Sequence, residues 1–253
     1  MIGVLVLTGL TGLAAGSFVG VVADRVPRGR SIAAGRSHCD GCGEMIAAYD
    51  NVPLVSWLLL RGRCRTCQAP ISVRYPLVEL ALGALYLATF LVLRGDPAEL
   101  ALGLVFVTAL AAITLTDLEL HLIPNRILLA ATVIGLAIVV PTDPGSLPER
   151  AIAAAAAGGG LLLVAIAYPR GMGMGDVKLA AVMGLYLGRA VAPALLVAFA
   201  AGALVAVAML ARDGSAARKR KIPFGPFLAF GGVVGLLAGN AMLDWYLDSF
   251  FEG

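Results

Sequence analysis

Residues 100–116 read LALGLVFVTALAAITLT, an apolar run without a charged side chain that ends at Asp117. A helix needs about 20 mostly apolar residues to cross a bilayer. With 60% hydrophobic and 14% charged residues, the chain has the composition of a membrane protein. We therefore predict an all-α polytopic membrane protein with about eight transmembrane helices. The other stretches free of Lys, Arg, Asp and Glu are Met1–Ala23, Leu80–Leu93, Ile127–Thr142, Ala151–Pro169, Leu179–Gly188, Ala190–Ala211 and Ile222–Leu243.

The sixth of these eight stretches is short for a transmembrane helix. If the loop around Asp176 and the basic run Arg218–Lys221 lie on the same side of the membrane, residues 177–211 must cross twice. That leaves about 17 residues per crossing, which just suffices. We expect a tight turn at Gly188-Arg189.

Eight crossings place both termini outside, and the basic residues then divide sixteen inside to three outside. Lys and Arg favour the cytoplasmic side, so the division supports this orientation. The net charge of +3 thus reflects topology and gives no indication of nucleic-acid binding. The first span has no basic segment before it and is too long for a removable signal peptide. The expected inside residues are Arg25, Arg28, Arg30, Arg36, Arg61, Arg63, Arg65, Arg74, Arg126, Arg170, Lys178, Arg212 and Arg218–Lys221.

Four cysteines lie in the one sizeable polar segment, residues 24–75, as two C-x-x-C pairs separated by 21 residues. This spacing is typical of a structural zinc site with four cysteine ligands, with disulfides or redox-active dithiols as the alternatives. The loop is expected in the reducing cytoplasm, where disulfides rarely persist, which favours zinc. Zinc would also supply folding free energy to a loop with few large apolar residues. The predicted ligands are Cys39, Cys42, Cys64 and Cys67.

The sequence therefore suggests three parts. Residues 1–23 form the first transmembrane helix, residues 24–75 a cytoplasmic zinc-binding domain, and residues 76–253 a seven-helix membrane core.

Two aspartates stand at the edges of apolar segments, where ionisable groups are costly and usually functional. Asp117 ends the third predicted span, and Asp176 follows the run Gly171–Gly175. The alternative interpretation makes Asp117 an ordinary interfacial residue and Asp176 a helix cap. If they meet, two carboxyl groups cannot both ionise easily. One would then take a proton from water while the other hydrogen-bonds a scissile carbonyl. We predict that Asp117 and Asp176 are the catalytic pair.

Substrate-binding residues are also expected around these loops. Gly173 and Gly175 offer a strip of backbone that could accept an extended peptide. Lys178 would steady an aspartate or extend to the lipid headgroups. Glu79, near the cytoplasmic end of the second span, would contribute to the substrate or cofactor site or pair with Arg74.

Six motifs in order resemble those of the type IV prepilin peptidases, over most of the chain. Asp117 falls in the first aspartate motif, and Gly173-Met174-Gly175-Asp176 is the G-x-G-D motif. The other matching stretches are Gly16–Pro27, the two cysteine pairs with Asn51–Trp57, Arg74–Glu79, and Ile222–Phe227. Asn125 and Gly20 depart from the usual acid and the usual Asn of this family.

The resemblance implies an aspartyl endopeptidase of the bacterial inner membrane. It would cut the basic leader of a type IV prepilin or pseudopilin after a glycine, at the cytoplasmic face. Complete members also methylate the new N-terminal residue with S-adenosylmethionine, and members lacking the cysteine loop tend to lack that activity. The four cysteines therefore imply both activities here. Besides the pilin substrate and membrane lipid, no nucleic-acid partner is implied.

Two other functions fit parts of the pattern. A G-x-G-D membrane protease without methyltransferase activity shares the aspartates, but the cysteine loop argues against it. A non-enzymatic transporter or metal-binding membrane protein would more naturally hold its carboxylates in mid-span.

Overall fold

The computed structural model describes residues 2–33, 35–168, 171–214 and 222–251. Arg170 and Arg218–Lys221, expected on the cytoplasmic side, lie outside the described residues. Within the described ranges the regular elements are helical, with two isolated β-bridges in the cysteine loop. The 3-10 helices are η1 (Ala48–Asn51), η2 (Pro144–Ser146) and η3 (Gly188–Ala190). The α-helices are α1 (Ile2–Arg25), α2 (Val55–Leu59), α3 (Arg74–Leu93), α4 (Pro97–Leu120), α5 (Asn125–Thr142), α6 (Leu147–Ala167), α7 (Met174–Leu187), α8 (Val191–Asp213) and α9 (Gly225–Phe251).

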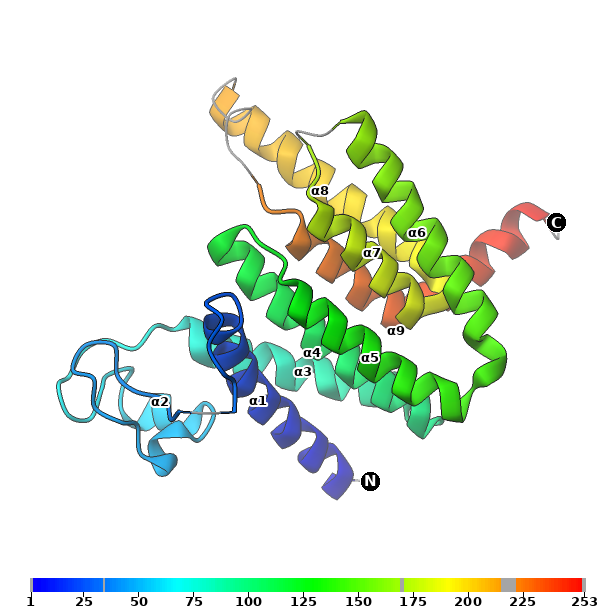
Figure 1. The fold of residues 1–253 in the computed structure, drawn as a ribbon. Helices are drawn as coiled ribbons and strands as arrows, with labels where there is room; N and C mark the ends of the chain where they lie inside the picture. Colours follow the sequence, from blue (N-terminus) through cyan, green and yellow to red (C-terminus); the bar gives the residue numbers. More distant parts are fainter. Residues whose placement is uncertain (1, 34, 169–170, 215–221, 252–253) are drawn as a thin grey trace. The chain divides into compact units, whose positions relative to one another are not determined.

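Seven helical segments of the described chain are long and apolar enough to cross a membrane. One of them, Met174–Asp213, contains both α7 and α8, and the chain reverses between them at η3 (Figure 1). The turn expected at Gly188-Arg189 is thereby confirmed. Gly188 has φ +54°, a conformation that suits glycine and ends α7. With this segment divided, the all-helical membrane fold agrees with the predicted eight helices.

The two helices of this pair are unequal, where about 17 residues each were expected. α7 has 14 residues and α8 has 23. α7 begins three residues before the predicted residue 177, directly after Gly173, which is extended with φ −83° and ψ 150°. It is the shorter helix because it ends at Leu187, before the turn at Gly188. A helix of 14 residues is about 21 Å long, shorter than the roughly 30 Å hydrocarbon core of a bilayer.

The chain divides into two compact units, Met1–Arg94 and Gly95–Gly253. In the first unit α1 packs antiparallel on α3 through glycines. A Cβ at Gly12 would lie 2.8 Å from the Cα of Gly83, and one at Gly16 would lie 2.5 Å from the Cα of Glu79. Small residues allow this close approach between membrane helices. The cysteine loop, with η1 and α2, connects the two helices (Figure 1).

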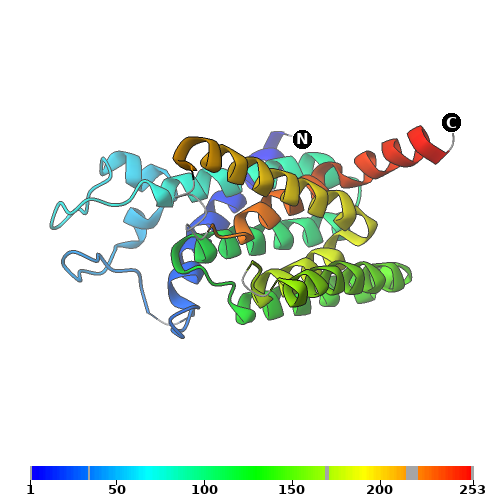
Figure 2. The ribbon, with the colours of Figure 1, turned by 90° about the horizontal axis from the view of Figure 1, so that it is seen from above.

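The second unit is built from antiparallel pairs that also pack through small residues. In the α6–α7 pair, a Cβ at Gly158 would lie 2.9 Å from the Cβ of Ala181. In the α8–α9 pair, a Cβ at Gly231 would lie 2.8 Å from the Cβ of Ala198. The C-terminal part of α9 projects beyond the other helices of this unit in both views (Figures 1 and 2).

One packing layer joins α4, α7 and α9. The ring of Phe106 on α4 stacks on Tyr186 of α7, with centroids 4.9 Å apart. A Cβ at Gly232 of α9 would lie 2.9 Å from Cδ1 of Leu110 and 3.5 Å from Cε of Met183. The four side chains of this layer are buried and apolar or aromatic. Their close packing therefore fixes the positions of α4, α7 and α9 along their axes relative to one another.

Candidate functional site

Asp117 lies in the last turn of α4 and is only 6% exposed. Its Oδ2 accepts a hydrogen bond of 2.8 Å from the backbone N–H of Gly225, the first residue of α9. The helix ends just after Asp117 because His121 adopts the left-handed conformation, with φ 52°. Its N–H donates to the Asp117 carbonyl at 3.0 Å, which closes the turn. The side chain is thus held where the membrane helix stops.

Asp176 lies in the first turn of α7 and is 8% exposed. Its Oδ2 accepts from the backbone N–H of Gly173 at 3.1 Å. A carboxylate at this position satisfies one of the unpaired N–H groups of a helix start and is favoured by the helix dipole. Asp176 therefore does cap the start of α7, as the alternative interpretation predicted. It uses only one of the two carboxylate oxygens.

The shared packing layer brings both aspartates to the same end of the second unit. Asp117 follows Leu110 by seven residues, while Asp176 precedes Met183 and Gly225 precedes Gly232 by the same number. Seven residues are nearly two turns, so each residue lies on the same face as its layer member, about 10.5 Å further along. α7 and α9 run antiparallel to α4, and the three displacements therefore point the same way. Both carboxyl groups therefore lie at the end of the unit where α4 stops and where α7 and α9 begin.

Each aspartate uses only one of its two carboxylate oxygens in these hydrogen bonds. In the hydrogen bonds of the described residues, Oδ2 is engaged in each case and Oδ1 in neither. Water or a peptide carbonyl can therefore be bound by the Oδ1 atoms without breaking the backbone contacts that orient the side chains.

The two glycines of the G-x-G-D motif have different places. Gly173 is extended and gives its N–H to Asp176. Gly175 is inside the first turn of α7, where a Cβ would lie 2.9 Å from the Cβ of buried Ile123. Gly175 therefore lets α7 approach the segment that follows Asp117.

Lys178 and Glu79 each hold a neighbouring segment in place. Nζ of Lys178 donates to Oδ1 of Asn125 at 2.9 Å, which ties α7 to the start of α5. Glu79 belongs to the first unit and is 8% exposed. Its Oε2 accepts from the backbone N–H of Leu54 at 2.8 Å, so it holds the cysteine loop to α3.

Sequence reasoning assigned no role to Gly225 or Ile123. Gly225 lies in the motif Ile222–Phe227. The sequence pattern identified this motif but did not predict the contact of Gly225 with Asp117. A Cβ at position 225 would lie 2.6 Å from Oδ2 of Asp117, and glycine is therefore needed for this approach.

All four cysteines meet in the first unit. They are free thiols whose sulfur atoms all lie within 4.8 Å of one another, and Sγ of Cys39 is 3.7 Å from Sγ of Cys67. A Zn–S bond of about 2.3 Å places the sulfurs of a regular tetrahedron about 3.8 Å apart. The cluster therefore fits a zinc ion.

Each C-x-x-C pair forms the same turn, which explains how the sequence builds the cluster. Cys39 N–H donates to the Glu44 carbonyl, and the equivalent Cys64 N–H donates to the Ala69 carbonyl, both at 2.9 Å. The fourth residue after the first cysteine, Gly43 or Gln68, has positive φ in both turns. The backbone N–H groups of Cys67 and Thr66 lower the pKa of the Cys64 thiol to about 7. The backbone hydrogen bond at Glu44 lowers the pKa of the Cys42 thiol, but the neighbouring thiols Cys67 and Cys39 outweigh it, and this pKa is raised to about 12.

An ion pair supports the second turn. Nε and Nη2 of Arg65 donate to the two carboxylate oxygens of Asp50 at 2.8 and 2.6 Å. These hydrogen bonds hold the pKa of Asp50 below its usual value. The guanidinium also lies 5.5 Å from the centre of the Tyr49 ring. The pair thus joins η1 to the second cysteine turn.

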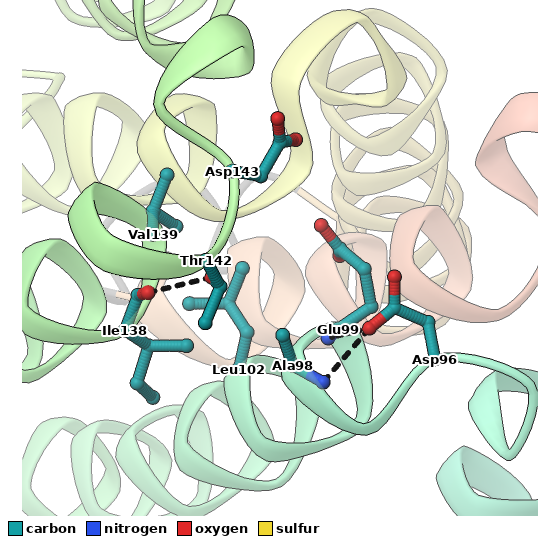
Figure 3. A pocket seen from close by; sticks show the side chains of 8 residues that line it. All are labelled: Asp96, Ala98, Glu99, Leu102, Ile138, Val139, Thr142 and Asp143. Atoms are coloured by element: carbon teal, nitrogen blue, oxygen red, sulfur yellow. Dashed lines mark hydrogen bonds between the residues drawn. The ribbon is translucent and has the colours of Figure 1, made fainter.

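The other end of the second unit has a pocket of about 210 Å³ (Figure 3). Glu99, which lines this pocket, also belongs to a polar network around Arg150. Buried Arg150 pairs with Glu99 and donates to the carbonyls of Leu185 and Tyr186. Because Glu99 and Asp117 are near opposite ends of α4, this pocket is separate from the aspartates. Its lining residues are Asp96, Ala98, Glu99, Leu102, Ile138, Val139, Thr142 and Asp143.

Comparisons with known proteins match both units. Residues 10–93 match the bacterial peptidase A24 N-terminal domain, and residues 104–209 match the type IV leader peptidase family. Three similar proteins carry the name prepilin leader peptidase/N-methyltransferase. Those of Aeromonas hydrophila and Myxococcus xanthus are both 39% identical, over 85% and 81% of this chain and 76% and 63% of their own. That of Bacillus subtilis is 32% identical over 93% of this chain and 95% of its own. No solved structure matches the chain.

Proposed function

Because this chain belongs to the type IV leader peptidase family, we propose that Asp117 and Asp176 are the catalytic pair that removes the leader of a type IV prepilin or pseudopilin. One observation carries the proposal. Two buried carboxylates from separate helices lie at the same end of the unit, and each is oriented by one backbone N–H.

The reaction needs one ionised and one protonated carboxyl group. The ionised aspartate takes a proton from water, whose oxygen attacks the scissile carbonyl carbon, while the protonated aspartate hydrogen-bonds the carbonyl oxygen. The C–N bond then breaks as the nitrogen receives a proton. The products are a leader ending in a carboxylate and a pilin with a new N-terminal amine. The pair titrates as a unit, so the base and the acid are roles within the pair.

The family supports a prepilin as substrate, with cleavage after the glycine that ends its basic leader. We propose that the extended backbone at Gly173 and the side chain of Lys178 contact the substrate beside Asp176. Gly175 would contribute by allowing α7 to approach Ile123. We propose that Glu79 acts from the first unit by fixing the cysteine loop, since its carboxylate already holds Leu54.

The second proposed activity is N-methylation of the new amine, as in the names of the relatives. S-adenosylmethionine, when bound, would supply an electrophilic methyl group to that amine. We propose that zinc is held by Cys39, Cys42, Cys64 and Cys67 in a closed structural site, because four thiolates complete its coordination.

The proposed orientation follows from charge placement in this multi-pass membrane protein. Both termini would be extracytoplasmic, and the cysteine loop and aspartate loops would face the cytoplasm of the bacterial inner membrane. The division of the chain at 1–23, 24–75 and 76–253 remains part of this proposal.

The test is to incubate the purified full-length protein with a prepilin that carries a Gly-Phe junction. Cleavage shortens the prepilin by its leader, which a gel and mass spectrometry detect. Cleavage after that glycine supports the proposal. An uncleaved substrate, with a well-folded protein, would favour a transport or binding role. Methyl transfer is followed separately with labelled S-adenosylmethionine.

A further inference from the structure

An apolar surface of the cysteine loop has no partner among the described residues of the first unit. The short helix α2 presents Val55, Leu58 and Leu59 on one face, and these side chains are 52%, 65% and 78% exposed. Positions i, i+3 and i+4 of a helix are neighbours, so the three side chains form one patch. Val52 and Tyr49, 45% and 68% exposed, precede it in the chain. We call the face made by Val55, Leu58 and Leu59 the α2 patch.

The opposite side of α2 is fixed to the rest of the loop. Ser56 is buried, and its Oγ donates to the Tyr49 carbonyl at 2.8 Å. Nε1 of Trp57 donates to the carbonyl of Ile71 at 3.1 Å. The helix therefore cannot rotate its apolar side chains inward without breaking these contacts. The exposure of the α2 patch is built into the loop.

The contact with Glu79 places α2 beside a membrane helix. Leu54, the residue directly before α2, donates its N–H to Oε2 of Glu79. Glu79 is five residues beyond the start of α3, or about 7.5 Å along the helix axis. α3 is a candidate membrane span, and α2 begins level with its second turn, at the end of that span. Leu77 and Leu80 on the same part of α3 are also exposed, at 57% and 55%.

The charge of the loop suits a membrane surface as well. Residues 24–75 contain eight arginines and four acidic residues. Arg61 and Arg63, which follow α2, are exposed. Exposed apolar side chains flanked by basic residues are typical of segments that lie in the interface of a bilayer with anionic lipids.

We propose that the α2 patch inserts into the headgroup boundary of the bilayer, so that the cysteine loop rests on the membrane through a third contact besides α1 and α3. The contact would set the height of the loop above the lipid. It would leave the two cysteine turns in water, with Met45 at the base of the first one, where it pairs with His38.

The experiment uses the full-length protein in lipid nanodiscs, with Leu59 replaced by the fluorescent residue dansylalanine, which leaves all four cysteines intact. The matched control carries the same replacement at Met45, an apolar side chain 61% exposed in the same loop. Nitroxide groups on the acyl chains near the headgroups report lipid contact, and iodide reports water. Zinc content and helical content are measured first, to identify a misfolded variant. If the variant labelled at 59 is misfolded, the label is placed at Leu58 instead.

We expect lipid nitroxide to quench the label at 59 at least about threefold more than the label at 45, with iodide showing the reverse order, as for a helix 5–10 Å inside the boundary. Equal quenching by lipid at both positions would overturn the proposal. A label at 59 shielded from both lipid and iodide would also overturn it, because protein, such as another part of the chain, a second copy or the substrate, would then cover the patch.

Discussion

The backbone N–H of Gly225 donates a hydrogen bond of 2.8 Å to Oδ2 of Asp117, although the two residues are 108 positions apart. α9 thereby orients a carboxylate that belongs to α4. A hydrogen bond to a charged group contributes about 1.5–3 kcal/mol, and an unoriented carboxylate would lose part of its reactivity.

Gly225→Ala should therefore slow cleavage. The added Cβ would lie 2.6 Å from Oδ2 of Asp117 and must displace it or the start of α9. We expect kcat to fall about 10- to 100-fold with little change in KM, from the hydrogen-bond energy above. Gly239→Ala is the control. Position 239 lies further along α9, where the added Cβ would meet Ala190 and not Asp117. It should lower the melting temperature and leave kcat nearly unchanged. Equal kcat for Gly225→Ala and the unmodified protein would remove Gly225 from the mechanism.

The cysteine cluster should bind one zinc ion per chain. Cys39→Ser and Cys64→Ser should each lose the metal, because a structural site needs all four thiolates. Metal analysis of the purified protein measures this directly. Limited proteolysis should then cut the loop between α1 and α3 while the second unit stays intact. A metal-free protein with a protease-resistant loop would contradict the structural role of zinc.

The ion pair between Asp50 and Arg65 should slow zinc release. Asp50→Asn weakens both hydrogen bonds to the guanidinium, and zinc transfer to a coloured chelator should become faster. Arg65 holds the pKa of Asp50 below its usual value, so the carboxylate stabilises the loop above the unfolded pKa of about 3.9 and loses this effect only in stronger acid. The difference between the two proteins should thus stay constant from about pH 6 to pH 8. A difference that disappears within this range would indicate another group.

Buried Arg150 is expected to stabilise the second unit without taking part in cleavage. Its guanidinium donates to two carbonyls at the end of α7 and pairs with Glu99, which is 37% exposed. Arg150→Met should cost about 2 kcal/mol, less than the loss of a fully buried pair, because water can reach Glu99. Thermal unfolding measures the loss. Cleavage per folded molecule should remain unchanged, since Glu99 and Asp117 are 18 residues, about 27 Å, apart on α4.

The fold was largely accessible from the sequence because membrane helices are set by local apolar length. The charge-free run before Asp117 became α4, and Gly188-Arg189 became the turn between α7 and α8. The bounds of α7 were harder to predict. Its start depends on the extended backbone at Gly173, which hydropathy does not report.

The cysteine cluster was predictable for a different reason. Two short turns of equal spacing carry all four sulfurs, so little beyond the sequence pattern is needed to bring them together. The site around the aspartates depends on long-range contacts. The contacts of Asp117 with Gly225, and of Gly175 with Ile123, follow from how α4, α7 and α9 pack. Periodicity along any one helix does not contain that information.

The most direct test of the catalytic pair compares prepilin cleavage by Asp117→Asn, Asp176→Asn and the double variant. Asparagine keeps the shape of the side chain and its acceptor for the backbone N–H, but it cannot exchange a proton. Residues that act as a unit are not additive, so each single variant should lose as much activity as the double variant, with melting temperatures close to that of the unmodified protein. Cleavage by either folded single variant well above the double variant would contradict the pair.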